Sequence, residues 1–511
     1  MNQPSAGLGH RAMNHSLRAR RLGLHTQHEM IVLMRTDCHV CRSEGLSARS
    51  QVLVRSGAQE VLATLYQASG DFLKIDEVGL SEAAWQRLHV SDGDLLTVRH
   101  ADPVESLGLV RQRIYGHRLD HSAFSAIMAD IVDGRYSDVH LSAFLTAGAA
   151  LPLDEREIIE LTRVMVETGE RLKWKDSRIV DKHSVGGLPG NRTTPIVVAI
   201  VAAHGLVMPK TSSRAITSPA GTADTMETLA PVDLDLSAIR RVVESESGCI
   251  VWGGSVRLSP ADDILIRIER ALDLDTEGQL IASVLSKKIA AGSTHLVLDI
   301  PVGPTAKVRS VEAADLLSQR LSKVAEAFGL QVRVIPSDGS QPVGRGIGPA
   351  LEARDVLAVL QGKADAPPDL RERACRLAGV LLELGGRAPT GAGTRLAEAT
   401  LSDGRAWVKF QRICEAQGGM RLPGIAKQSH PLLSQKLGRV ARIDNRKLSK
   451  LAKLAGAPES KAAGIELHVR LGDSINVGEP LCTLHSETRG ELEYALEFAT
   501  NHVDVFEVDQ S

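Results

Sequence analysis

One segment concentrates residue types that bind anions. Residues 181–195 read Asp-Lys-His-Ser-Val-Gly-Gly-Leu-Pro-Gly-Asn-Arg-Thr-Thr-Pro, and the apolar run 196–203 follows. Glycines let backbone N–H groups approach an anion, and a helix start adds unpaired donors and a favourable dipole. Lys182 supplies a point charge, while Ser184 and Thr193 supply hydroxyls. The segment predicts a phosphate site, although a turn-rich strand-to-helix connection has the same composition. It is not a Walker loop, because it lacks the Gly-Lys-Ser/Thr sequence.

A second segment has a similar composition. Residues 209–227 read Pro-Lys-Thr-Ser-Ser-Arg-Ala-Ile-Thr-Ser-Pro-Ala-Gly-Thr-Ala-Asp-Thr-Met-Glu, with Arg214 among the hydroxyls. Two hydroxyl-rich glycine loops that flank one helix can converge on one oxyanion, and hydroxyls suit a phosphate that must stay nucleophilic. We expect Asp224 and Glu227 to begin the following helix, where carboxylates complement the helix dipole.

A third segment, residues 278–288, has the pattern of an amphipathic helix. Ser283 and Lys287 are four residues apart, so they share one helix face, and the apolar residues occupy another. Taken alone, this pattern also fits a helix with a solvated lysine pair. Asp275 lies just ahead of the segment, and Lys307 follows a predicted strand and a glycine.

The elements that position these segments follow from periodicity and turn residues. From about residue 179, strand patterns such as 294–300 and 331–335 alternate with helical patterns such as 311–328. This alternation predicts an α/β domain with a largely parallel sheet. The glycine- and proline-rich loops follow the carboxyl ends of the strands, where α/β sheets place ligands.

The chain has 511 residues, enough for about three or four domains. The predicted fold class is α/β, with a helical domain packed against a larger α/β domain, a small N-terminal β-rich domain and a C-terminal α+β domain. The predicted boundaries are 1–102 for the β-rich domain, 103–176 for the helical domain, 177–430 for the α/β phosphate-binding domain and 431–511 for the C-terminal domain. Within the last domain, residues 464–481 predict two short strands around a turn.

Composition excludes several classes of protein. Lys and Arg number 60 against 62 Asp and Glu, and aromatic residues make up 3%, which disfavours a nucleic-acid-binding protein. The apolar run 196–203 is far shorter than the roughly 20 residues that span a membrane. The first 25 residues carry arginines but no apolar region of a signal peptide. We therefore predict a cytoplasmic protein with an unstructured basic tail.

The six cysteines do not form a disulfide framework in so long a chain. Cys38 and Cys41 form a Cys-x-x-Cys pair, but no second pair follows at zinc spacing. A structural or chance pair is favoured over a metal site, and we predict no metal.

Together, the three segments resemble the thymidine and pyrimidine-nucleoside phosphorylase family. The motifs Lys182-His-Ser-x-Gly-Gly, Ser213-Arg214 with Gly221-Thr222-x-Asp224-x-x-Glu227, and Ala282-Ser-x-Leu-Ser-Lys-Lys288 occur in the family's order and spacing. The resemblance covers about residues 105–500. The added N-terminal domain and the sequence of residues 213–218 are most similar to the second subfamily. That subfamily includes archaeal AMP phosphorylase and bacterial proteins labelled thymidine phosphorylase.

The resemblance implies reversible phosphorolysis, in which inorganic phosphate attacks C1′ of a nucleoside and the base leaves. By motif, the phosphate positions are Lys182, Ser184, Thr193, Ser212 and Thr222, and the base-contacting positions are Ser283 and Lys287. The positions that match nucleotide contacts of AMP phosphorylase are Gly187, Ser213, Arg214, Ala215, Ile216, Thr217, Ser218, Thr222, Ser283 and Lys307. Asp275 matches its proton donor, and His183 is a second catalytic candidate because of its place in the first loop.

The substrate and the partners are also expectations from the resemblance. Residues 266–271 lack the Arg-Asp pair of pyrimidine members, and residues 218–221 replace their His-Thr-Gly-Gly loop. We therefore expect a nucleoside 5′-monophosphate to be turned over at least as well as thymidine. No cofactor is implied, because phosphate is a substrate, and a homodimer or larger homo-oligomer would form through residues 105–175 and 262–290, the latter joining the helical domain. A non-catalytic nucleotide- or phosphate-binding protein is the alternative from another class.

Overall fold

The computed structural model describes residues 16–27, 29–215, 218–274 and 276–509. The chain divides into two compact units, residues 1–109 with 129–140 and residues 110–128 with 141–511. In the described part of the chain, no helix is long and apolar enough to cross a membrane.

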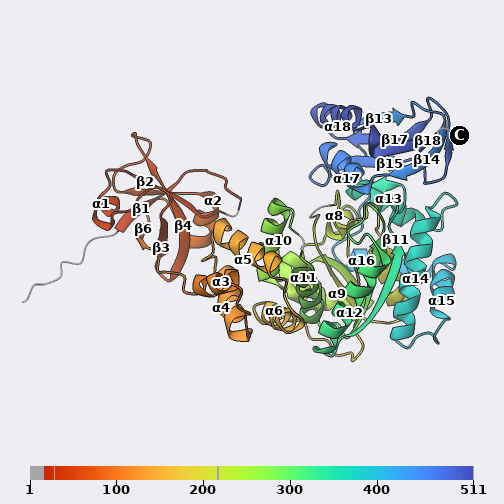
Figure 1. Cartoon of the computed structure of the whole chain (residues 1–511), viewed down its shortest axis with the longest axis horizontal. Helices are drawn as coiled ribbons and strands as arrows, with labels where there is room; N and C mark the ends of the chain where they lie inside the picture. Colours follow the sequence, from red (N-terminus) through yellow and green to blue (C-terminus); the bar gives the residue numbers. More distant parts are fainter. Residues whose placement is uncertain (1–15, 28, 216–217, 275, 510–511) are drawn as a thin grey trace, which may run out of the picture. The chain divides into compact units, whose positions relative to one another are not determined.

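The first unit contains a closed β-barrel with the strand order β1-β5-β2-β4-β3-β6 (Figure 1). Its elements are β1 (Ser16–Arg21), β2 (Ile31–Arg35), α1 (His39–Glu44), β3 (Gln51–Ser56), β4 (Gln59–Ala68), β5 (Glu77–Leu80), α2 (Glu82–Leu88) and β6 (Leu95–His100). Alternate side chains point inward along each strand, so Val52 and Val54 of β3 and Leu96 and Val98 of β6 are fully buried. The β-rich N-terminal domain predicted from the sequence is confirmed.

The prediction of an unstructured basic tail is wrong for residues 16–21. They form β1, which pairs parallel with β5 and antiparallel with β6. Leu17 and Ala19 are buried in the barrel core, whereas Arg18 and Arg20 are exposed. The arginines occupy the outer face of the strand, so the alternation of side chains, rather than their summed charge, determines the structure here.

The helices that follow the barrel, with two from later in the chain, are α3 (Leu107–Ile114), α4 (His121–Val132), α5 (Asp138–Ala150), α6 (Glu155–Glu167), α10 (Pro260–Leu272) and α11 (Glu277–Ala290). Asp154 and Glu157 form a capping box that begins α6. Glu157 is also buried and accepts a hydrogen bond from Nη1 of Arg113 at 2.5 Å. α11 packs against α6, and Gly278 at its start allows close contact with Leu153.

The α/β part of the second unit is built on parallel strands. They are β7 (Val180–Ser184), β8 (Met208–Ser212), β9 (Gly248–Trp252), β10 (His295–Val302) and β11 (Gln331–Asp338). The order is β11-β10-β7 and β8-β9, and a parallel bridge between Ile179 and Val207 joins the two groups. The surrounding helices are α7 (Thr194–Ala203), α8 (Thr222–Glu227), α9 (Leu236–Glu246), the 3₁₀ helix η1 (Gly253–Val256), α12 (Val311–Glu326), α13 (Pro349–Leu360), α14 (Pro368–Leu384), α15 (Gly393–Ser402) and α16 (Arg405–Ala416).

The sequence patterns in this region are borne out. β10, β11 and α12 confirm the predicted strands at 294–300 and 331–335 and the predicted helix at 311–328. The apolar run 196–203 lies in α7, which is buried on all sides from Thr194 to Ala202. A helix apolar all round is expected at the centre of a large domain.

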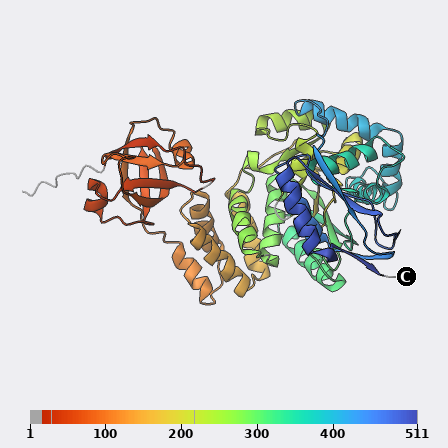
Figure 2. The same ribbon diagram turned by 90° about the horizontal axis from the view of Figure 1, so that it is seen from above.

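The C-terminal part combines two sheets with two helices, and all of its elements except β12 are drawn in blue in Figures 1 and 2. Its elements are β12 (Gly346–Ile347), β13 (Gln428–Leu433), β14 (Gly438–Ile443), α17 (Asn445–Leu454), β15 (Gly464–Leu467), β16 (Ser474–Ile475), β17 (Pro480–Ser486), α18 (Arg489–Asn501), the 3₁₀ helix η2 (Val503–Val505) and β18 (Phe506–Asp509). The sheets have the orders β12-β15-β17-β13 and β16-β14-β18. The α+β domain is therefore confirmed, but the two strands predicted within 464–481 do not pair with each other, because each joins a different sheet.

Candidate functional site

The carboxyl ends of the parallel strands bring the predicted loops to one edge of the sheet. Ser184 ends β7 and Ser212 ends β8, and each is followed by one of the hydroxyl-rich glycine loops. Gly187 has a φ of +80°, and a Cβ there would lie 3.0 Å from the backbone N of Lys307. The loops after β7 and β10 therefore touch at a position that favours glycine.

The predicted anion ligands Lys182 and Ser184 form hydrogen bonds with residues just before α7. Nζ of Lys182, which is buried, donates a hydrogen bond to Oγ1 of Thr193 at 2.8 Å. Nδ2 of Asn191 donates to Oγ of Ser184 at 3.2 Å. Thr193 precedes the first turn of α7, whose N–H groups point toward the same loop. The structure thus brings a cation, two hydroxyls and a helix start together.

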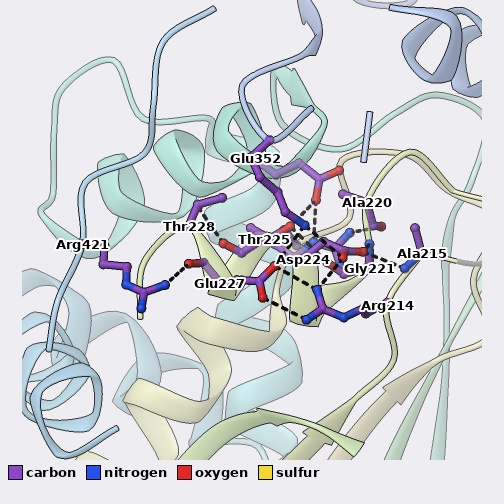
Figure 3. Close-up of polar contacts among 12 residues, drawn as sticks. Arg214, Ala215, Ala220, Gly221, Asp224, Thr225, Glu227, Thr228, Glu352 and Arg421 are labelled. Atoms are coloured by element: carbon purple, nitrogen blue, oxygen red, sulfur yellow. Dashed lines mark hydrogen bonds and ion pairs between the residues drawn. The ribbon is translucent and has the colours of Figure 1, made fainter. Parts of the chain in front are cut away.

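Arg192 connects this loop with the second one. Its Nη1 donates to Oγ1 of Thr222 at 2.8 Å, and its Nη2 donates to the carbonyl of Ala220 at 2.8 Å. Its Nε donates to the buried carboxylate of Glu352 on α13 at 2.5 Å, and Oγ1 of Thr225 donates to the same carboxylate (Figure 3). No sequence motif indicated a role for Arg192 or Glu352. Arg192 holds the predicted ligand Thr222, and Glu352 holds Arg192.

Ser212, another predicted phosphate ligand, is buried, and its hydroxyl has no hydrogen-bond partner among the described residues. A buried hydroxyl normally finds a partner, so this group is available to a ligand at the strand edge. The chain beyond it folds tightly, because a Cβ on Gly221 would lie 2.5 Å from the carbonyl oxygen of Ser213. The loop 213–221 therefore requires glycine at this position.

Asp299 on β10 is a further residue that the sequence did not indicate. It is fully buried, and its Oδ2 accepts hydrogen bonds from Oγ of Ser184 at 3.0 Å and from Nδ2 of Asn191 at 3.1 Å. Its Oδ1 accepts a hydrogen bond from Ser337 and lies 3.8 Å from Nη1 of Arg373. A carboxylate therefore sits directly behind the predicted phosphate ligands.

Arg214 is paired with carboxylates rather than left with a free charge. Its Nη1 and Nη2 donate to Glu227 at 2.9 Å, and Nη1 also donates to Asp224 at 3.2 Å (Figure 3). Nζ of Lys461 lies 3.0 Å from Glu227, and the Arg214 guanidinium lies 5.0 Å from the ring centre of Trp252. Glu227, the bidentate partner, holds the pKa of Arg214 above its ordinary value, and Arg214 lowers the pKa of Glu227 to about 2.

The carboxylate of Asp224 also orders the loop backbone. Its Oδ2 accepts hydrogen bonds from the N–H groups of Ala215 at 2.6 Å and Gly221 at 2.9 Å. Asp224 lies in the first turn of α8, as predicted, whereas Glu227 is the last residue of that short helix. Ser218 donates to the carbonyl of Ala220. Ile216 and Thr217 lie outside the described residues.

The other face of β7 carries a separate buried charge cluster. Asp181 lies 2.7 Å from Nζ of Lys288 and 3.5 Å from Nζ of Lys210. Burial lowers the pKa of His183 well below its ordinary value, and the neighbouring lysines, Lys288 first, lower it further. The imidazole is therefore neutral at physiological pH, and strand alternation places it on the opposite face from Lys182.

The predicted base-contacting residues lie on α11. Nζ of Lys287 is 2.5 Å from Oδ2 of Asp262, a fully buried residue of α10 that the sequence did not indicate. Burial opposes the charged form of Lys287, but Asp262 and Asp263 together raise its pKa. Ser283 lies one turn earlier on the same helix. Asp275, the predicted proton donor, lies outside the described residues.

The cysteine pair lies in the barrel. Cys38 and Cys41 are buried, and Sγ of Cys38 accepts a hydrogen bond from the backbone N–H of Cys41 at the start of α1. Within the described ranges, no group of three or more His, Cys, Asp or Glu side chains has the arrangement of a metal site.

The affinity for phosphate is expected to fall as the pH rises through about 8. Burial lowers the pKa of Lys182 to about 8. The ammonium is the form that attracts an anion, so its contribution is present below that pH and is lost above it. The KM for phosphate, measured on both sides of that pH, should rise in the alkaline arm while the KM for the nucleoside stays level. A flat phosphate KM would exclude Lys182 as the titrating ligand.

The chain belongs to the glycosyl transferase family, as its fold and this site predict. Residues 108–169 match the helical bundle domain of that family, residues 176–407 match its a/b domain, and residues 439–505 match the pyrimidine nucleoside phosphorylase C-terminal domain. The family resemblance of the three motifs is thus confirmed, and the protein class is a glycosyltransferase enzyme.

Named relatives cover nearly the whole chain. The protein "Putative thymidine phosphorylase" of Chelativorans sp. (strain BNC1) is 66% identical over 97% of each chain. The protein of the same name from Tolumonas auensis is 64% identical over 97% of this chain and 98% of the relative. Among solved structures, anthranilate phosphoribosyltransferase from Thermus thermophilus has a TM-score of 0.50 and 21% identity, and covers 60% of this chain and 98% of that chain. That likeness concerns the fold.

Proposed function

We propose that the chain catalyses the reversible phosphorolysis of thymidine or a related nucleoside to free base and (deoxy)ribose 1-phosphate. The observation that carries this proposal is the linked set Lys182, Ser184, Thr193 and Thr222 at the sheet edge. It stands in a chain whose relatives are named putative thymidine phosphorylase. Inorganic phosphate is then a substrate, and the reaction needs no cofactor.

The proposed chemistry assigns one task to each part of the site. A phosphate oxygen attacks C1′ as the bond from C1′ to the base nitrogen breaks, and the bond electrons leave with the base. Lys182 and the hydroxyls hold the phosphate, and the charged Lys287 with Ser283 faces the base, where negative charge develops. Asp275 is proposed to protonate the leaving base. His183, the second catalytic candidate, is neutral and lies on the opposite face of β7 from Lys182, so it is given no step in this scheme.

The substrate class has two candidates. The names of the relatives favour thymidine. The hydroxyls of the loop 213–218 favour a 5′-monophosphate, although Glu227 and Asp224 already neutralise Arg214 and Lys461 in this structure. Paired cations attract a further phosphate less strongly than free ones, so the contacts support the nucleoside first. We further propose a cytoplasmic homodimer or larger homo-oligomer.

The test is release of free base. Purified protein is incubated with inorganic phosphate and a panel of thymidine, uridine, cytidine, AMP, CMP and UMP, and free base is separated and quantified. We expect base release that requires phosphate, with thymidine among the substrates. Release from the monophosphates but not from thymidine would establish the second candidate, and no release from any compound would contradict the enzyme assignment.

A further inference from the structure

The hydroxyl groups of the proposed phosphate site do not all have the same hydrogen-bond polarity. A lysine or arginine donates only, and a carboxylate accepts only. A hydroxyl that accepts from a cation keeps its proton for a ligand, whereas a hydroxyl that donates to a carboxylate has only lone pairs left. The hydrogen-bond partners of each hydroxyl within the protein therefore determine whether it donates to a ligand or accepts from one.

Two threonines are left as donors. Thr193 Oγ1 accepts from Lys182, and Thr222 Oγ1 accepts from Arg192, both at 2.8 Å. Neither hydroxyl has an acceptor among the described residues, so each O–H is free to point at an anion. These groups suit the unprotonated oxygens of any tetrahedral anion.

Ser184 and Asn191 are left as acceptors. Ser184 Oγ donates to the Asp299 carboxylate at 3.0 Å and accepts from Asn191 Nδ2, which leaves it one lone pair. Asn191 Nδ2 also donates to Asp299, so the carboxylate fixes the orientation of the amide. Asn191 Oδ1 therefore points away from Asp299. It is buried and has no hydrogen-bond partner in the described part of the chain. This corner of the site therefore needs a proton donor from the ligand.

We propose that Asp299 makes the site selective for an anion that carries a hydroxyl, such as monohydrogen phosphate, and selective against sulfate. Monohydrogen phosphate offers acceptor oxygens to Lys182 and the threonines and one P–OH to Ser184 and Asn191. Sulfate has the same shape and a double negative charge but no proton, so its oxygen would face the lone pairs of that corner. Specificity then arises from an interaction that is unfavourable for the wrong ion.

This inference rests on the proposed function and adds Asp299 as a positioning residue, since it acts on the anion through Ser184 and Asn191. In Asp299→Asn the amide N–H is able to donate to Ser184, which frees the serine proton for the ligand. The matched control is Asp338→Asn, which removes a carboxylate from the end of the neighbouring strand β11, where Asp338 caps the loop through the backbone N–H of Ser340.

The test is calorimetric binding of inorganic phosphate and of sulfate at equal ionic strength. We expect wild-type protein and Asp338→Asn to bind phosphate at least about tenfold more tightly than sulfate, the effect of one unmatched buried polar group. Asp299→Asn should reduce that ratio about tenfold. Ser184→Ala, which serves if Asp299→Asn does not fold, should also reduce the phosphate-to-sulfate ratio, because it removes both the acceptor for the ligand proton and a lone pair that opposes sulfate.

Two results overturn the inference while the proposed function stands. One is wild-type protein that binds sulfate as tightly as phosphate and still releases base with phosphate. The other is a phosphate-to-sulfate ratio that neither Asp299→Asn nor Ser184→Ala changes. Wild-type protein that binds neither anion and releases no base would instead contradict the proposed function, and the inference with it.

Discussion

The variant Lys182→Ala is expected to need a far higher phosphate concentration for half-maximal rate. Lys182 is buried and held by Thr193 at the edge of the sheet, so no surface lysine replaces it. Loss of one charge-assisted hydrogen bond costs about 1.5–3 kcal/mol, which raises the KM for phosphate roughly 10- to 150-fold. Steady-state kinetics with phosphate as the varied substrate measure this change.

The control is Lys363→Ala, which removes one positive charge from an exposed turn after α13. It should leave the KM for phosphate at the wild-type value. In Lys182→Ala the KM for the nucleoside should change little, because the proposed base contacts lie on α11. A Lys182→Ala enzyme with an unaltered phosphate KM would remove this residue from the anion site.

Local sequence patterns predict much of the fold because they report burial and backbone geometry. The run 196–203 is apolar at every position, and α7 is buried on all sides. The strand patterns predicted to end at Pro301 and Pro336 correspond to β10 and β11, although both strands continue past those prolines. Summed charge is a poorer guide. It did not indicate β1, whose Arg18 and Arg20 lie on the outer face while Leu17 and Ala19 face the barrel core.

The residues that hold the site are less predictable, because their partners are distant in the chain. Ser184 and Asp299 are 115 residues apart, and Arg192 and Glu352 are 160 apart. Such pairs depend on which strands and helices become neighbours, and no local periodicity encodes that. The motif residues themselves were recognisable, since they lie in loops at strand ends.

Residue type also does not show whether a charged side chain is paired within the protein or available to a ligand. Arg214 is a cation in a hydroxyl-rich loop at a strand end, as an anion ligand would be, yet the structure pairs it with Glu227 and Asp224. Lys182, by contrast, contacts a neutral hydroxyl and keeps its charge available. The distinction between a cation that is paired within the protein and one that can bind a ligand therefore comes from tertiary contacts.

Substitution of Glu352 is expected to cause the largest loss of stability among the site residues. In Glu352→Ala the guanidinium of Arg192 stays buried without its carboxylate, and Thr225 loses one of its two acceptors. Breaking one side of a buried ion pair costs about 3–5 kcal/mol. Denaturant unfolding followed by circular dichroism should show that decrease in the free energy of unfolding, and the KM for phosphate should rise because Arg192 no longer fixes Thr222.

A double variant separates these two effects. Arg192→Met with Glu352→Leu replaces both charges by apolar side chains of similar size, which for a buried pair is often nearly neutral for stability. It should therefore recover most of the lost free energy of unfolding. The KM for phosphate should nevertheless stay high, because methionine cannot donate to Thr222. If the double variant regained both stability and phosphate affinity, the Arg192–Glu352 pair would be a packing element only, and the direction of the Thr222 hydroxyl would have to come from elsewhere.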